Sequence, residues 1–254
     1  MEVDHDPMDA PSRVVTSNGS IVGIVWFEQL DAHAGSVDEV MERLSPGDFL
    51  SADTTILDAV EIFCGRPNYY FYLLDKNDVI GVMFFNDLFK PLARLAYLAL
   101  ALEIEQLALN LCQLLQTRAK CWEAFPEARK RKTLEAYEQI FGRPAEQHPG
   151  KLPIKALIAC TNLIDKATMI WKCKLIPTKS RKEVLSFFHS LKEVRDHCAH
   201  PGREQELLNL LPRERLKEFV EKANDIRIAL SESIEKYSNE PVRIFLGDPS
   251  NLDV

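Results

Sequence analysis

Three residues near the end of one predicted helix could act together on a phosphodiester. Arg195, Asp196 and His200 lie within six residues of one another and are followed by Pro201. Arginine keeps its positive charge at any working pH and suits phosphate binding, whereas histidine can move a proton near neutrality. The set predicts chemistry at a phosphodiester, and the open alternative is an ordinary polar helix end.

A capping box predicts where the helix that carries these residues begins. Ser180 is followed three residues later by Glu183, which is the spacing of such a box. Pro201 disfavours helical dihedrals at His200 and ends the helix. Apolar residues recur between these limits at helical spacing and predict a buried stripe of Val184, Phe187, Phe188, Leu191, Val194 and Cys198.

The spacing of the two candidate catalytic residues matters for the predicted assembly. Arg195 and His200 would lie about 140° apart around an ideal helix. One phosphate can therefore meet both only at a frayed last turn, or where a second subunit brings in the same helix.

The pattern Arg195-Asp196-x-x-x-His200 resembles the signature of HEPN domains, an all-helical family named for higher eukaryotes and prokaryotes nucleotide-binding. Many members are metal-independent ribonucleases that work as dimers with a composite site, and others are inactive interaction modules. The resemblance implies that Arg195 and His200 are the catalytic pair. Asp196 would be the polar residue between them, a position where asparagine is common in the family.

This resemblance implies a separate role for each of the three residues. His200 would serve as general base or acid, and Arg195 would hold the phosphate and its developing charge. Asp196 would orient the imidazole or raise its pKa. One histidine supplies a single proton-transfer partner, so a twofold dimer would supply the second.

An internal repeat with a period of 58 residues occupies the first part of the chain. Residues 17–30 match residues 75–88 without a gap. Each copy reads as a polar turn, an apolar strand, a glycine and a second apolar segment. A helix start is predicted from Thr54 to Phe63, and a buried strand from Tyr69 to Leu74.

The repeat resembles a pair of cystathionine-β-synthase (CBS) domains, in which two strand-helix-strand-strand-helix copies pack by pseudo-twofold symmetry. The second copy covers about 46–92, and the first is expected to keep only its last strands and helix. A Gly-apolar-x-Thr-x-x-Asp segment binds adenine nucleotides in that family, with threonine at the phosphate and aspartate at the ribose. Asp87 matches the ribose aspartate, but Phe84 replaces the threonine, and Trp26 and Gln29 replace both residues in the first copy. We therefore expect a structural or dimerising half without a cofactor, with adenine-nucleotide sensing as the alternative.

Helical periodicity without further strand patterns follows the repeat and predicts a bundle of about five helices. They are expected at 88–116, 127–141, 153–172, 180–200 and 216–237. Arg94, Glu103 and Glu105 interrupt the apolar run at 88–116, which predicts a core helix and no membrane span.

Charge is distributed unevenly along the chain. Residues 1–117 carry 6 Lys and Arg against 18 Asp and Glu, a net charge of −12, whereas residues 118–240 carry 24 against 18, a net charge of +6. The second part is predicted to meet a polyanion, and the open alternative is a helical domain with many surface lysines. The basic run from Arg129 to Lys132 is predicted to be a solvated helix start.

Cysteine and histidine usage points to a reduced protein without a metal. The six cysteines form no CxxC pair, and the acidic N-terminus has no apolar segment typical of a secretory signal. His197, Cys198 and His200 lack a second Cys/His cluster to complete a metal site. We expect a cytoplasmic protein with reduced, mostly buried thiols.

These observations predict an α+β protein. A small CBS-like α/β domain at 13–92 precedes a HEPN-like helical bundle at 93–240, with a disordered start at 1–12 and a tail at 241–254. The favoured function is a metal-independent endoribonuclease with a regulatory or dimerising CBS-like half. The alternative is a non-catalytic nucleotide-sensing or protein-interaction module. The expected partners are a second copy of the chain, RNA and a protein regulator.

Overall fold

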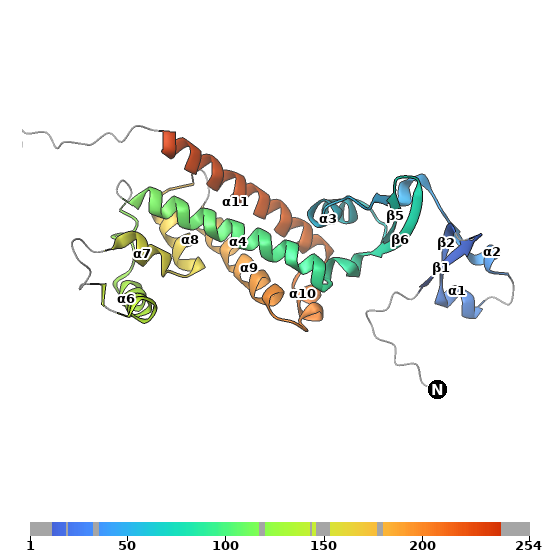
Figure 1. The fold of residues 1–254 in the computed structure, drawn as a ribbon, viewed down its shortest axis with the longest axis horizontal. Coiled ribbons are helices and arrows are strands. Elements are labelled where there is room, and N and C mark those ends of the chain that lie inside the picture. The colour runs from blue at the N-terminus through green and yellow to red at the C-terminus, as the bar shows by residue number, and fades with distance from the viewer. Residues whose placement is uncertain are drawn as a thin grey trace, which may run out of the picture. The chain divides into compact units, whose positions relative to one another are not determined.

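The computed structural model describes residues 12–18, 20–32, 36–116, 120–142, 144–145, 153–176 and 180–239, with the backbone alone for 30–32. Helices and two small sheets make an α+β fold, which confirms the predicted class (Figure 1). Ser12 lies in the first strand, and the rest of the predicted disordered segment 1–12 and the tail 241–254 lie outside the described residues.

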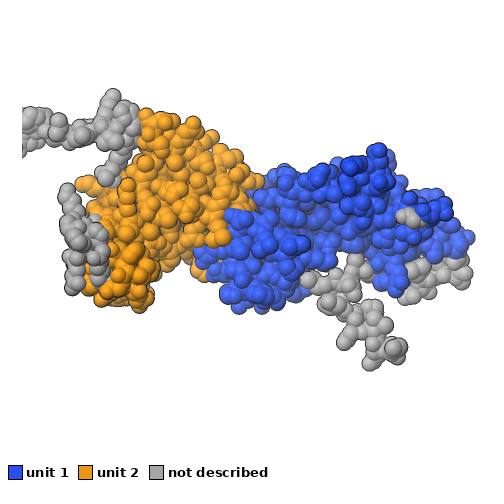
Figure 2. All heavy atoms as spheres, viewed as in Figure 1, with its two compact units in different colours: residues 1–99, 194–221 blue, residues 100–193, 222–254 orange. Residues whose placement is uncertain are grey.

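The chain divides into two compact units. Unit 1 comprises Met1–Ala99 and Val194–Glu221, and unit 2 comprises Leu100–Glu193 and Lys222–Val254 (Figure 2). Three long helices contribute residues to both units: α4 (Pro91–Leu114), α9 (Arg181–Ala199) and α11 (Arg213–Asn239). The domain limits suggested by the two family resemblances, 13–92 and 93–240, stay a prediction.

Unit 1 contains both sheets. The first sheet has the order β1 (Ser12–Ser17), β2 (Ser20–Trp26), β3 (Glu42–Arg43), and all its pairs are antiparallel. The second has the order β4 (Phe49–Ser51), β5 (Tyr70–Asp75), β6 (Asp78–Phe84), with β4 parallel and β6 antiparallel to β5. Short helices join the strands: α1 (Phe27–Ala32), α2 (Val37–Val40), η1 (Pro46–Asp48), α3 (Ile56–Gly65) and η2 (Phe85–Phe89).

The 58-residue repeat is confirmed in the geometry of the two hairpins. Each strand of the β5–β6 hairpin begins and ends 58 residues after its equivalent in β1–β2. The register shifts between Val15 and Thr16 in one hairpin and between Leu73 and Leu74 in the other, which are equivalent positions. The turn residues Asn18 and Lys76, also equivalent, both have positive φ angles of 51° and 54°.

The helix predicted before the second hairpin is confirmed as α3, and the strand predicted at 69–74 is confirmed as β5, the first strand of that hairpin, with Phe71 and Tyr72 buried. Helix α3 begins after Thr55, whose side chain accepts a hydrogen bond from the backbone N–H of Asp58 at 3.2 Å. This is the N-cap arrangement that short polar side chains favour. Residues 49–89 therefore run in the order strand, helix, strand, strand, 3₁₀ helix.

The remaining helices are α6 (Glu127–Phe141), α7 (Ile154–Ala159), α8 (Leu163–Lys172) and α10 (Glu204–Leu210). Helix α6 has the predicted limits and ends at Gly142 with φ 70°, the left-handed conformation that glycine tolerates. No strand follows Phe84 in the described part of the chain, as predicted.

The prediction of a single helix at 153–172 is wrong, because the structure has two helices there, α7 and α8. Thr161 Oγ1 donates to the carbonyl of Ile158 at 2.7 Å and closes the first helix. The side chain of Asn162 accepts from the N–H of Asp165 at 2.9 Å, which starts the second. Polar side chains that bond the nearby backbone favour such helix ends over helix interiors.

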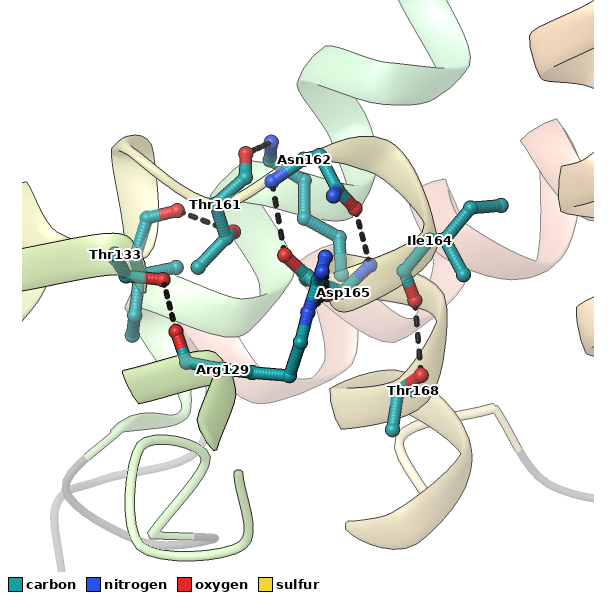
Figure 3. Close-up of polar contacts among 9 residues, drawn as sticks. Arg129, Thr133, Thr161, Asn162, Ile164, Asp165 and Thr168 are labelled. Atoms are coloured by element: carbon teal, nitrogen blue, oxygen red, sulfur yellow. Dashed lines mark hydrogen bonds and ion pairs between the residues drawn. The ribbon is translucent and has the colours of Figure 1, made fainter. Parts of the chain in front are cut away.

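A polar network in unit 2 surrounds this break (Figure 3). Nε and Nη2 of Arg129 donate to Oδ1 of the buried Asp165 at 2.8 and 2.6 Å, and Nζ of the buried Lys166 donates to the carbonyl of Thr161 at 2.6 Å. Lys130 pairs with Glu127 at 2.7 Å on the same helix. Arg131 and Lys132 are exposed, as predicted for a solvated helix start. Arg129 and Lys130 instead make intramolecular ion pairs, and that of Arg129 reaches the buried Asp165, so the prediction is wrong for these two residues.

Helix α4 is the one helix in the described part of the chain that is long and apolar enough to cross a membrane by length and composition. One of its faces is fully buried and consists of Tyr97, Ala101, Ile104, Ala108 and Leu111. This face is the kind of stripe that a helix buries in a protein core. The expectation of no membrane span stays a prediction.

Candidate functional site at the end of helix α9

The local sequence builds helix α9 as predicted. The backbone N–H of Ser180 donates to Glu183 Oε2 at 2.8 Å, and the N–H of Glu183 donates to Ser180 Oγ at 3.2 Å, which is a complete capping box. The predicted apolar stripe is buried at every position: Val184, Phe187, Phe188, Leu191, Val194 and Cys198. Because this stripe is buried, the opposite face of the helix, which carries polar residues near its end, is turned toward solvent.

The three candidate residues of the motif lie on or just beyond the last turns of this helix, in unit 1. Arg195 donates from Nε and Nη2 to Asp196 Oδ1 at 3.2 and 3.0 Å. Both side chains are partly exposed, by 26% and 37%. His200 is exposed and follows the helix end at Ala199, and its N–H donates to the carbonyl of His197 at 3.4 Å. The last turn is thus tightened, and all three residues can be reached by solvent.

A buried arginine from helix α4 holds the backbone of this turn. Arg94 is only 4% exposed. Its Nη2 donates to the carbonyls of His197, Cys198 and His200 at 3.1, 3.1 and 2.5 Å, and its Nη1 pairs with Glu204 at the start of α10. The last carbonyls of a helix have no partners within it and carry partial negative charge, so a cation here stabilises the helix end.

The role of Arg94 at the site is not predicted from the sequence, in which this residue only interrupts an apolar run. A usable signal was present, because an arginine among apolar residues near the start of a core helix is rarely buried without a partner. The identity of its partners had no sequence signal, because they lie more than 100 residues further along the chain.

Helix α10 carries further charged groups to the same place. Glu206 Oε2 lies 3.4 Å from His197 Nε2 and 3.7 Å from Arg203 Nε. Helix α10 also packs against η2, the 3₁₀ helix that contains Asp87. The end of the motif helix and the end of the second repeat therefore belong to one compact unit.

Asp87, the predicted ribose aspartate, caps its own helix. Its Oδ2 accepts from the N–H of Phe84 at 2.7 Å, and its Oδ1 pairs with Lys90 Nζ at 2.7 Å. At the equivalent position of the first repeat, Gln29 Oε1 accepts from the N–H of Trp26 at 3.5 Å. The same capping contact thus recurs in both copies, with two different side chains.

Aromatic side chains and a carboxylate gather where the CBS resemblance would place phosphate contacts. Trp26 Nε1 and the Tyr70 hydroxyl donate to the two oxygens of Glu42, at 3.0 and 2.7 Å. The Tyr70 ring also packs against Trp26 and Phe84, with centroid distances of 5.7 and 6.1 Å. Burial and the hydrogen bond to Glu42 raise the pKa of Tyr70, so its hydroxyl stays a neutral donor.

We expect AMP and ATP to bind this half weakly or not at all, because Glu42 repels phosphate and the rings of Trp26 and Phe84 stand where a hydroxyl would be needed. Isothermal titration calorimetry at neutral pH measures the affinity. Micromolar binding that disappears in Asp87→Ala and persists in the control Asp78→Ala would show that Asp87 binds the nucleotide. The alternative, that this half senses adenine nucleotides, would then hold.

The thiols offer no nucleophile at the motif. All six cysteines are free, and Cys198 is buried beside the motif. Burial raises the pKa of Cys198 to about 11, so the thiol is protonated at neutral pH. Within the described residues, no group of three or more His, Cys, Asp or Glu side chains is placed to hold a metal ion.

No family model, no curated protein and no solved structure matches this chain. The HEPN and CBS resemblances therefore rest on the motif, the repeat and the order of the elements.

Proposed function

We propose that the protein is a metal-independent endoribonuclease of HEPN type, with Arg195 and His200 as its catalytic pair. One observation carries the proposal. Both side chains are reachable by solvent at the end of a helix whose backbone is held in place by the buried Arg94. Catalysis by positioning requires reacting groups that substrate can reach and that a fixed backbone holds in place.

The chemistry follows from the two side chains. Cleavage of RNA without a metal needs a base for the 2′-hydroxyl, a cation for the phosphorane charge and an acid for the departing 5′-oxygen. His200 can move the protons. Arg195 already donates two hydrogen bonds to one carboxylate oxygen of Asp196, and a phosphate oxygen fits the same fork of donors.

A dimer would complete the proton transfers. The signature assigns one catalytic histidine per chain, His200, whereas cleavage needs both a base and an acid. A second copy with its α9 end at the same phosphate would supply the other. Light scattering at micromolar concentration should show a dimer, and a strict monomer would contradict this composite site.

The direct experiment is a cleavage assay of the full chain on single-stranded and hairpin RNAs, with and without EDTA. We expect cleavage at equal rates in both conditions. Cleavage that requires Mg²⁺ would contradict the proposed mechanism. Absence of cleavage on every RNA, by a folded protein, would favour the alternative function.

The alternative is a non-catalytic interaction module, and exposed leucines favour it. Leu92 and Leu95, on the first turns of α4, are 82% and 57% exposed. Large apolar side chains that lie together on a surface are typical of protein contacts. Retained binding of a partner by a variant without any cleavage activity would support this function.

Asp196→Asn should lower the cleavage rate only a few-fold. Asparagine keeps a side-chain oxygen that can accept from Arg195 and is the common residue at this position in HEPN domains. Steady-state kinetics on a fluorescent RNA measures the change. A loss as large as that of Arg195→Ala would mean that the carboxylate charge itself is needed, as a general base or as the partner that fixes the guanidinium.

A further inference from the structure

The guanidinium of Arg94 makes an unusual set of contacts for a buried side chain. Three of its neighbours are main-chain carbonyls from one short segment, the carbonyls of His197, Cys198 and His200. The fourth is the Glu204 carboxylate, which is mostly buried. Burying an arginine is costly unless it is paired and hydrogen-bonded. Nη1 and Nη2 of Arg94 have such partners, whereas its buried Nε has no hydrogen bond within the described part of the chain.

These contacts fix the backbone on both sides of the helix end. The carbonyls of His197 and Cys198 belong to the last turn of α9, and that of His200 lies beyond it. One nitrogen, Nη2, meets all three, so the path of the chain from the helix to Pro201 is set by a single group. Because His200 is held by its own carbonyl at 2.5 Å, its Cα is fixed while its imidazole remains exposed.

We propose that Arg94 is a positioning residue for His200, and that Glu204 holds the guanidinium in the orientation this requires. The inference rests on the proposed ribonuclease function and adds a residue to its site. Nη1 binds Glu204 while Nη2 binds the carbonyls, so both terminal nitrogens of the planar guanidinium make contacts. A lysine has one point charge on a flexible stem and cannot reproduce both contacts.

A second arginine in unit 1 provides a matched control. Arg213 donates to the carbonyls of Phe63, Arg66 and Asn68 and thereby holds the end of α3. It resembles Arg94 in that one guanidinium meets several carbonyls at a helix end, although Arg213 is only partly buried. None of these carbonyls belongs to the motif. Arg213→Lys should therefore cost stability in the same way without moving His200.

The experiment compares Arg94→Lys with Arg213→Lys in the full chain, by RNA cleavage kinetics and by NMR of the histidine rings. The His200 resonances are assigned by their loss in His200→Gln. We expect kcat to fall about tenfold or more in Arg94→Lys, with KM nearly unchanged, because small misplacements of a reacting group cost large factors in rate. The His200 ring resonances should move in Arg94→Lys and stay at their wild-type positions in Arg213→Lys.

Unchanged His200 resonances in Arg94→Lys, or a loss of kcat no greater than that of Arg213→Lys, would overturn the inference. If wild type cleaves no RNA, the proposed function fails, and the resonances alone still decide whether Arg94 positions His200. If Arg94→Lys does not fold, Glu204→Gln replaces it. That variant keeps the guanidinium but weakens its orientation, and it should move the same resonances with a smaller loss of kcat.

Discussion

Cleavage of RNA should fall by about 100-fold or more in His200→Ala, and by a similar factor in Arg195→Ala. The first change removes the proton carrier and the second removes the cation that meets the phosphorane charge, and each such group contributes on the order of 10² or more in rate. Initial rates on a fluorescent RNA in EDTA measure the effect. Neither residue belongs to the buried stripe of α9, so both variants should remain folded by circular dichroism.

His189→Ala is the matched control for the histidine. His189 is exposed on the same helix but lies nearly three turns before the helix end. Its removal should leave the rate within about twofold of wild type. Equal rates in wild type and His200→Ala would place any observed cleavage elsewhere or in a contaminant.

Gly23→Ala should destabilise the first sheet by about 2–4 kcal/mol, because forced overlap in a packed sheet displaces the backbone. A Cβ at Gly23 would lie 2.5 Å from Met41 Cγ and closer still to the carbonyl oxygen of Glu42. Urea unfolding and hydrogen exchange of the β2 amides measure the change.

The equivalent glycine of the second repeat is the control. Gly81 follows Gly23 by 58 residues, but a Cβ there would meet only Leu73 Cδ1, at 3.9 Å. Gly81→Ala should therefore change the stability by less than about 1 kcal/mol, and the loss of glycine's conformational freedom could make that change favourable. Equal effects of the two substitutions would show that β3 does not pack on β2 as described.

Local sequence patterns predicted much of this fold. The two hairpins, helix α6 and the start of α9 each depend on residues close together in sequence, such as Gly142 after α6 and the Ser180–Glu183 box. Such patterns extend over one helical turn or one hairpin, so they can be recognised without knowledge of the tertiary structure.

The break between α7 and α8 was not predicted, although its residues are local. The apolar stripe of 153–172 continues across Thr161 and Asn162, so helical periodicity hides the cap that these two side chains make. Helix α10 was also missed, because it has only seven residues, too few for a helical period to be recognised.

The site itself was predicted only in part. Arg195, Asp196 and His200 were identified from one short segment, and the structure places them together at the end of α9. The contacts of Arg94 with the motif and of Glu42 with Tyr70 were not, because each joins residues far apart in sequence. Long-range pairs of this kind leave no periodic trace in a single sequence.

The most direct test of the central claim is the chemistry of the RNA ends. If His200 and Arg195 act on the 2′-hydroxyl and the phosphate, cleavage in EDTA must leave 2′,3′-cyclic phosphate and 5′-hydroxyl ends, because the attacking oxygen is part of the RNA. Mass spectrometry of the products identifies them, with the double variant Arg195→Ala/His200→Ala as the blank. Wild type should give these ends, and the double variant should give none. Products with 5′-phosphate and 3′-hydroxyl ends, or identical products from the double variant, would contradict it.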